Sequence, residues 1–171
     1  HFHVKEASSS DIASDVANGR LELGLVTQPV RATGLEISPM VDDHIVLIAS
    51  SDNPLARAKT VPVSALDGLN FVGFEGGSAI RQIVDASLRA AGIEINVVME
   101  LRSIPAIVRM VASTGNLAFV SQMGIQGQAL VKQVEISGVS ITRRLGLARR
   151  KGQSMSPATQ AFAEQLTSPF D

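Results

Sequence analysis

The stretch FVGFEGGSAIRQIVDASLRAAGIEINVVM, residues 71–99, decides the fold of this chain. It begins with a short apolar run over 71–74, which is typical of a buried strand, and a glycine-rich loop follows over 75–78. Apolar residues at helical spacing then predict a helix over 79–91; they are Ile80, Ile83, Val84, Leu88 and Ala91. A second strand is predicted over 95–99, so the stretch forms a β-α-β unit.

The ends of the predicted helices carry recognisable capping residues. Ser78 is the expected N-cap of the first helix, and Gly92 is expected to end it. A second helix is predicted over 103–113, with Pro105 in its first turn, where a missing N–H costs little. A strand over 117–121 follows, so the middle of the chain alternates β-α-β-α-β.

The N-terminal part predicts a smaller unit of the same kind. A strand is expected over 2–6, and the run Ser8-Ser9-Ser10 offers oxygens to cap a helix that stops at Asn18-Gly19. Another strand is expected over 21–26. Because a helix separates them, the two strands are predicted to be parallel with a right-handed crossover.

The remaining segments show shorter patterns. Residues 28–39 are expected to be a connector, because they contain two prolines and a glycine, and 44–49 is expected to be a buried strand. The predicted elements of the tail are a short helix over 124–130, strands over 131–136 and 144–149, and a helix starting at Ser156-Pro157.

This order predicts an α/β protein with two lobes of βα type, in which the second lobe interrupts the first. Lobe I is expected to comprise 1–42 and 137–171, and lobe II is expected to comprise 43–136. Because the chain crosses twice between the lobes, a cleft is predicted between them. Such clefts are where small ligands bind in open α/β folds.

The composition narrows the class of function. The 171 residues carry a formal net charge of −1, with 45% hydrophobic and 18% charged residues, which suits a globular core. The near-zero net charge argues against a dedicated nucleic-acid-binding protein, which would normally carry an excess of basic residues. The lack of cysteine excludes disulfides, zinc–thiolate sites and a cysteine nucleophile. No apolar run reaches the ~20 residues of a membrane span, and no signal peptide is visible.

Basic residues gather near the C-terminus, at Arg143, Arg144, Arg149, Arg150 and Lys151. A patch for anions or nucleic acid is one interpretation. A solvated strand edge is the favoured one, because no aromatic residue alternates with these charges and because basic residues on an edge strand discourage aggregation.

Residues suited to catalysis or metal binding are few. His1 and His3 would share one face of a strand, but terminal or surface residues explain them better. His44 follows Asp42 and Asp43, which indicates an Asp–His hydrogen bond, but no G-x-S-x-G elbow, P-loop or G-x-G-x-x-G motif accompanies them. We therefore expect no catalytic residue, no metal, no cofactor and no enzyme activity.

Two helix starts are better suited to binding. Ser8-Ser9-Ser10 and Gly76-Gly77-Ser78 each stand between a predicted strand and a predicted helix. Free N–H groups and the helix dipole at such places favour a carboxylate or another small anion. Plain helix capping explains the same residues. Because the two helix starts occupy equivalent places in the two predicted lobes, we consider anion binding and capping equally supported for them as a pair.

Several segments, taken in order, resemble the effector-binding domain of LysR-type transcriptional regulators. Residues 18–26 (NGRLELGLV) are similar to the family's G-x-L-D-L-(A/G)-I run, and residues 53–56 (NPLA) to its H-P-L-A run. Residues 111–120 (VASTGNLAFV) are similar to its V-A-x-G-x-G-I-x-x-(V/L)-P run, and Arg81 and residues 91–93 (AGI) also fit. The shared order and spacing cover nearly the whole chain.

The resemblance implies a fold like that of type 2 periplasmic binding proteins, with two lobes joined by crossover strands. It implies a small effector in the interlobe cleft, a homodimer or homotetramer in the bacterial cytoplasm, and no membrane. The hydroxyl- and glycine-rich positions matched below favour a carboxylate or another small polar ligand as that effector, with an anion expected. DNA would be bound only through a separate N-terminal winged helix-turn-helix. The ligand-binding residues carried over by position are Ser8, Ser9, Thr27, Phe74, Gly76, Gly77, Ser78, Ser121 and Gln122.

The chain departs from the family pattern in three ways. The DNA-binding domain is absent from this sequence, the family's first strand and helix before Phe2 are missing, and Ser121 stands where proline is common. A solute-binding receptor of a transport system with the same fold is the alternative function. That alternative predicts a signal peptide or a lipid anchor upstream.

Overall fold

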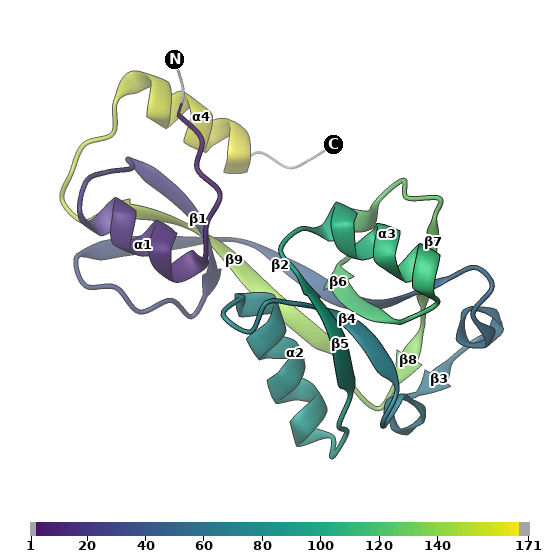
Figure 1. The fold of residues 1–171 in the computed structure, drawn as a ribbon. Helices are drawn as coiled ribbons and strands as arrows, with labels where there is room; N and C mark the ends of the chain where they lie inside the picture. Colours follow the sequence, from purple (N-terminus) through teal and green to yellow (C-terminus); the bar gives the residue numbers. More distant parts are fainter. Residues whose placement is uncertain (1–2, 168–171) are drawn as a thin grey trace. The chain divides into compact units, whose positions relative to one another are not determined.

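The computed structural model describes residues 3–167, which divide into two compact units (Figure 1). One unit contains the chain up to Asp42 and from Arg144 onward, and the other contains Asp43–Arg143. The helices are α1 (Ser9–Ala17), α2 (Ala79–Ala90), α3 (Ile104–Thr114) and α4 (Pro157–Thr167). The strands are β1 (Leu23–Gln28), β2 (Leu35–Ser50), β3 (Val61–Pro62), β4 (Asn70–Phe74), β5 (Asn96–Leu101), β6 (Ala118–Ser121), β7 (Val131–Val134), β8 (Ile136–Ser137) and β9 (Ile141–Arg150).

In the unit that contains both ends of the described chain, α1 packs on β1. Ile12, Ala13 and Val16 of the helix are buried together with Val26 of the strand. Gly24 permits this approach, because a Cβ at that position would collide with Cγ2 of Ile12. The close contact between helix and strand therefore depends on a glycine in β1.

The sheet of this unit is antiparallel where a parallel pair was expected. β1 pairs with β9, with Leu23 opposite Arg149. The whole sheet, whose strand β6 belongs to the other unit, has the order β1-β9-β2-β6. Phe2 lies outside the described residues, and residues 3–6 are exposed and form no strand. The predicted parallel pairing of 2–6 with 21–26 is therefore wrong. A strand needs a neighbour for its backbone N–H and C=O groups, and β1 finds that neighbour in β9.

β2 begins much earlier than expected, because residues 28–39 are not all connector. The strand runs over Leu35–Ser50 and contains Pro39. β6 and β7 pair only with the part of β2 from Ile45 onward. Pro39 thus lies where one edge of β2 has no strand partner among the described residues, and a proline is tolerated at such a place.

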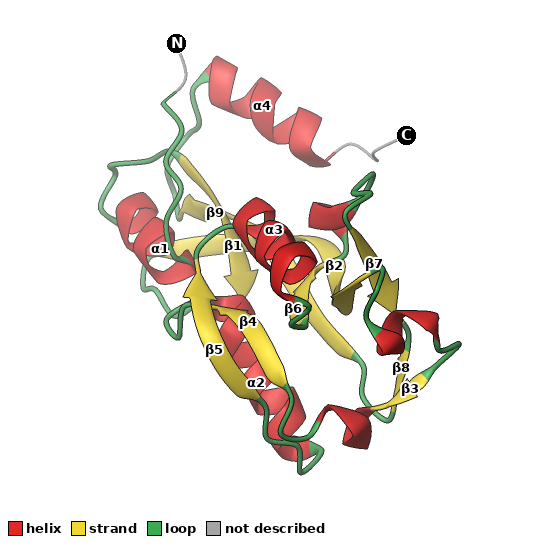
Figure 2. Ribbon diagram, turned by 45° about the vertical axis from the view of Figure 1, so that its right-hand side comes forward, coloured by secondary structure: helices red, strands yellow, loops and turns green. Residues whose placement is uncertain are grey.

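The second unit contains the predicted β-α-β-α-β order. β4 pairs parallel with β5, and on its other side Val72 donates a hydrogen bond from N to the Leu117 carbonyl at 2.8 Å. α2 and α3 both pack against β4 (Figure 2). The apolar core is extensive, and the rings of Phe71 and Phe119 stack within it with centroids 5.6 Å apart.

The tail differs from expectation in its helix and in its strand lengths. Only a 3-10 turn, Met123–Ile125, forms in the segment expected to be helical over 124–130. Gly127 has a φ of +75°, which a helix interior does not allow. The strand predicted over 131–136 is divided between β7 and β8, and β9 is longer than the predicted 144–149. α4 begins directly after Ser156, as expected.

The basic residues near the C-terminus are neither a free patch nor an edge. β9 lies between β1 and β2, so the expected strand edge is wrong. Three of the four arginines of β9 instead pair with acidic residues of β2, which the sequence patterns had not connected, and Arg150 donates a hydrogen bond to Gln153. The ion pairs are Arg143–Asp43, Arg144–Asp42 and Arg149–Glu36, with N to O distances of 2.7, 2.7 and 2.8 Å.

Candidate functional site

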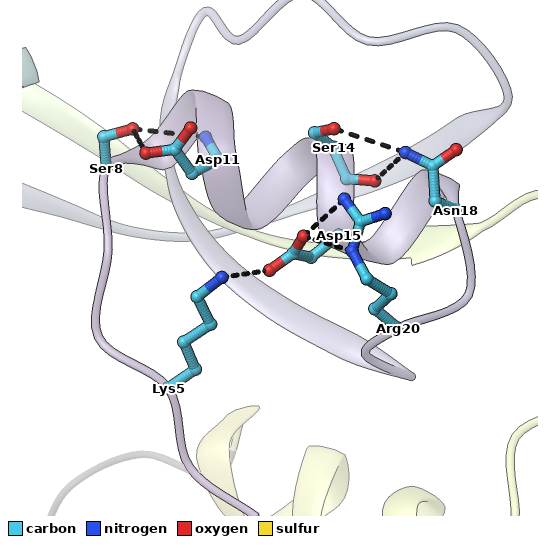
Figure 3. Close-up of polar contacts among 7 residues, drawn as sticks. All are labelled: Lys5, Ser8, Asp11, Ser14, Asp15, Asn18 and Arg20. Carbon is cyan, nitrogen blue, oxygen red and sulfur yellow. Dashed lines mark hydrogen bonds and ion pairs between the residues drawn. The ribbon is translucent and has the colours of Figure 1, made fainter.

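The first candidate loop lies at the N-terminus of α1 (Figure 3). The Ser8 hydroxyl accepts a hydrogen bond from the Asp11 N–H at 3.2 Å and donates one to Asp11 Oδ2 at 2.7 Å. The Asp11 carboxylate therefore already complements the helix dipole from within the first turn. An anionic ligand at this place would meet the negative charge of Asp11.

Ser9 fastens the same loop to β1. Its Oγ accepts a hydrogen bond from the Thr27 N–H at 3.0 Å. Thr27 is only 6% exposed. The structure thus brings Ser8, Ser9 and Thr27 together, with the Ser9 oxygen already accepting one hydrogen bond and the Thr27 side chain buried.

A buried carboxylate on α1 holds the segments on both sides of the helix (Figure 3). Asp15, which is 6% exposed, accepts hydrogen bonds from Lys5 Nζ at 2.6 Å and from Arg20 Nε at 2.7 Å. The hydrogen bond from Lys5, and then that from Arg20, hold the pKa of Asp15 below its ordinary value of 3.8. The chain before the candidate loop is therefore tied to the helix that follows it.

The second candidate loop, Glu75–Ser78, connects β4 to α2 in the other unit. Ser78 donates a hydrogen bond from N to the Glu75 carbonyl at 2.9 Å, but its side chain makes no capping hydrogen bond. The first turn of α2 contains no acidic residue, and open space surrounds Gly76 and Gly77. Of the two helix starts, this one therefore has N–H groups and a dipole that remain available to an anion.

The other sequence-predicted residues of this unit differ in exposure. Phe74 is 7% exposed and belongs to the core, and Ser121 is 2% exposed at the end of β6. Gln122 is exposed, and its N–H donates to the His44 carbonyl at 2.8 Å. Gln122, His44 and Gln133 line a polar surface groove of about 260 Å³. Among these predicted residues, Gln122 is the one whose side chain lies at the surface.

The motif Asp42-Asp43-His44 has a structural role in place of the expected Asp–His hydrogen bond. The Asp43 side chain is fully buried and accepts a hydrogen bond from Arg143 Nε at 2.7 Å. Its Oδ1 atom is buried and has no hydrogen-bond partner in the part of the chain that the structure describes. Asp42 is exposed and accepts two hydrogen bonds from Arg144. The two carboxylates are thus partners of arginines and not an acid–base dyad.

Sequence reasoning missed Glu22, which caps the last helix. Its Oε2 accepts hydrogen bonds from Thr159 Oγ1 at 2.5 Å and from Ser156 Oγ at 3.0 Å. The hydrogen bond from Thr159, and then those from Ser156, lower the pKa of Glu22. No local signal connects these residues, because Glu22 and Ser156 are 134 positions apart.

The residues that the structure describes contain neither a metal-ligating cluster nor a membrane-spanning helix. Within 3–167, no group of three or more His, Asp or Glu side chains is arranged to hold a metal ion. His1, one of the histidines considered above, lies outside that range. None of the described helices combines the length and the apolar character needed to cross a bilayer.

Two α/β units and a helix start whose N-cap side chain makes no hydrogen bond are features found in the class of domains that bind small ligands. The chain belongs to the LysR substrate binding domain family, whose model matches residues 1–170. The family resemblance and the α/β fold class expected from the sequence are therefore confirmed.

Individual relatives agree with this assignment. The chain is 30% identical to a "Probable RuBisCO transcriptional regulator" of Cyanophora paradoxa, with 99% of this chain and 54% of the relative covered. The chain thus spans about half the length of the curated relatives that it matches. The regulatory domain of Synechocystis CcmR in complex with 2-PG has a TM-score of 0.85 and 27% identity, with 95% and 81% of the two chains covered. The effector binding domain of QuiR in complex with shikimate shares the fold, with a TM-score of 0.82, 19% identity and coverages of 94% and 77%.

Proposed function

We propose that this chain is the effector-sensing domain of a LysR-type transcriptional regulator and that its effector is a small anion. The family match over residues 1–170 carries this proposal. The likeness to the CcmR regulatory domain in complex with 2-PG supports it further. The curated relatives are described as transcriptional regulators, which favours this function over a transport receptor or an enzyme.

The geometry of the second unit supports an anionic ligand. The start of α2 offers unpaired backbone N–H groups, a Ser78 hydroxyl that makes no capping hydrogen bond, and open space around Gly76 and Gly77. We assign the acidic group of the effector to this helix start. Gln122 of the same unit supplies a further hydrogen-bonding group, while Phe74 and Ser121 of that unit support the site from buried positions.

The proposal extends to the longer protein of which this chain is the sensing part. Effector binding shifts the population of conformations of this domain, and the shift rearranges a homodimer or homotetramer. A separate winged helix-turn-helix domain binds the operator DNA in the cytoplasm. The near-zero net charge of this chain agrees with DNA being bound by that separate domain and not by this one.

Calorimetric titration tests the ligand class. The purified chain is titrated with 2-PG, shikimate and inorganic phosphate, and the melting temperature is recorded with each. We expect saturable binding of at least one acidic probe, stronger for 2-PG or shikimate than for phosphate. An unchanged melting temperature and no heat with all three probes at millimolar concentration would contradict the proposed ligand class.

Matched serine variants locate the binding. Ser78→Ala removes a hydroxyl that makes no capping hydrogen bond, and we expect it to weaken binding by about two- to tenfold, the value of one hydrogen bond. Ser113→Ala is the control, because the Ser113 hydroxyl lies at the exposed end of α3 and donates to the Arg109 carbonyl. Equal affinities of the two variants would move the ligand away from the start of α2.

The coding sequence on both sides of this chain separates the two functions that share the fold. A helix-turn-helix upstream supports a regulator, and a signal peptide or a lipid anchor contradicts it. Sedimentation of the longer protein, with and without the probe that binds, then tests the oligomer.

A further inference from the structure

The loop that we propose to hold the effector is anchored by one arginine of the following helix. Arg81 lies in the first turn of α2, and its Nη1 donates a hydrogen bond to the Phe74 carbonyl at 3.0 Å. Phe74 is the last residue of β4. This hydrogen bond therefore closes a ring that contains the whole loop Glu75–Ser78.

Arg81 is itself held in one orientation by two carboxylates. Its Nε donates to both Asp85 oxygens at 2.9 Å, one turn further along α2, and its Nη1 donates to Glu100 on β5 at 2.9 Å. Only 17% of its side chain is exposed. Partial burial acts to lower the pKa of Arg81, but the hydrogen bonds to Asp85 and Glu100 outweigh it, so that the pKa is raised and the charge is secure.

The backbone beside the guanidinium is shaped to admit it. A Cβ at Gly73 would lie 3.3 Å from Arg81 Nη1 and 3.1 Å from Val97 Cγ1. The first residue of the loop has an anchor of its own, since the Glu75 N–H donates to the Leu101 carbonyl at 3.2 Å and its carboxylate accepts from Arg102 Nε at 2.7 Å. The two glycines that follow have open space around them. The start of the loop is thus rigidly held, and its tip depends on that start.

We propose that Arg81 is a positioning residue for effector binding, which acts by fixing the Phe74 carbonyl and thereby the N–H groups at the start of α2. It does so through the loop and without a contact of its own to the ligand. This inference rests on the proposed function for its effect on affinity. Its effect on the loop can be measured in the free protein.

Substitution of Arg81 by lysine separates the effect of its positive charge from the effect of its hydrogen-bonding geometry. Arg81→Lys keeps a positive charge near Asp85 and Glu100, but a single ammonium group lacks the planar fork that reaches the carboxylates and the Phe74 carbonyl together. Arg89→Lys, at an exposed position in the last turn of the same helix, is the matched control. Glu100→Gln leaves the arginine in place and weakens one of its holds, which gives an intermediate case.

Amide hydrogen exchange and titration with 2-PG form the test. In Arg81→Lys we expect faster exchange at Glu75 and Ser78, whose N–H groups donate to the Leu101 and Glu75 carbonyls. We also expect unchanged exchange in the second half of α2 and an affinity for 2-PG lower by about tenfold, as for one misplaced charge-assisted contact. Glu100→Gln is expected to fall between this variant and the wild type, and Arg89→Lys to match the wild type.

The outcomes for the two proposals are distinguishable. Exchange at Glu75 and Ser78 that is the same in Arg81→Lys as in the wild type would overturn the positioning role, whatever the affinity. Faster exchange throughout α2 would also overturn it, because Arg81 would then be a general stabiliser of the helix. Absence of 2-PG binding by the wild-type protein would count against the proposed ligand, while the exchange data would still decide the role of Arg81.

Discussion

Asp42 and Asp43 are neighbours in the chain, have the same chemistry, and differ in burial, so substitution of each by asparagine isolates the effect of burial. The Asp43 side chain is 0% exposed and Arg143, its partner, is 16% exposed. Asp42 and Arg144 are each 57% exposed. Both pairs have an N to O distance of 2.7 Å. The shortest N to O contact is therefore equally long in the two pairs, although Asp42 accepts two hydrogen bonds and Asp43 one, and the main difference is solvent exposure.

Asp43→Asn leaves the guanidinium of Arg143 without a counter-charge in a mostly buried place. Breaking a buried ion pair in this way costs about 3–5 kcal/mol, whereas the loss of an exposed pair costs about 0–1 kcal/mol. Against a total stability of roughly 5–15 kcal/mol, the first change is severe and the second is small. With about 2–4 °C per kcal/mol for a chain of this size, we expect Asp43→Asn to lower the melting temperature by roughly 6–20 °C.

Urea unfolding of the wild type and both variants, followed by circular dichroism, measures the contrast. High salt should reduce the small effect of Asp42→Asn and leave that of Asp43→Asn nearly unchanged, because buried charges are screened less. The double variant Asp43→Asn with Arg143→Met should recover part of the loss, since it removes the unpaired charge. Equal urea midpoints for Asp42→Asn and Asp43→Asn would refute the reasoning.

Three further predictions concern the unit that contains α1. Asp15→Asn should destabilise the domain at neutral pH. Because the pKa of Asp15 is lowered in the folded state, the stability that its carboxylate contributes is fully present above pH 3.8 and is lost as the pH falls through the folded pKa. The melting temperatures of wild type and variant should therefore converge in acid. Glu22→Gln should loosen the start of α4, which faster amide exchange near Ser156 would report, with exchange in α2 unchanged as the control. Gly24→Ala should cost about 1–3 kcal/mol by denaturant unfolding, because the added Cβ collides with Ile12; a stability equal to that of wild type would contradict the tight packing of α1 on β1.

Local signals allowed much of the fold to be predicted. Ser78 precedes α2, and Gly115 ends α3 with a φ of +73°, which is a conformation that glycine adopts without strain. Such signals depend on residues within one turn of each other. They identified α2 and α3 and the strands β4, β5 and β6 of the unit Asp43–Arg143, because these elements are short and follow one another in the chain.

Features that depend on distant partners could not be predicted. Pro39 indicates a break when only its neighbours are considered, yet β2 continues through it beside β9. Asp43 and Arg143 are 100 positions apart. Both residues were noted in the sequence, but their pairing could not be predicted from it. The cap that Glu22 provides for α4 could not be predicted for the same reason.

The difference between the two candidate loops was within reach of the sequence. Ser8 is followed three positions later by Asp11, which is the spacing of a capping box, whereas Ser78 is followed three positions later by Arg81. The first loop therefore satisfies its own helix start, and the second does not. A side-by-side comparison of these third positions would have favoured the loop before α2 as the anion site.

The ion pairs between β2 and β9 bear on the order in which the chain folds. β1 finds its partner in β9 only after all of Asp43–Arg143 has been synthesised. Closing so long a loop costs entropy, and pairing between distant segments slows folding. Domains generally fold as units. If the unit Asp43–Arg143 folds first, the ion pair between its first and last residues holds the start of β9 beside β2. The interrupting unit would then serve as a template on which the interrupted unit closes.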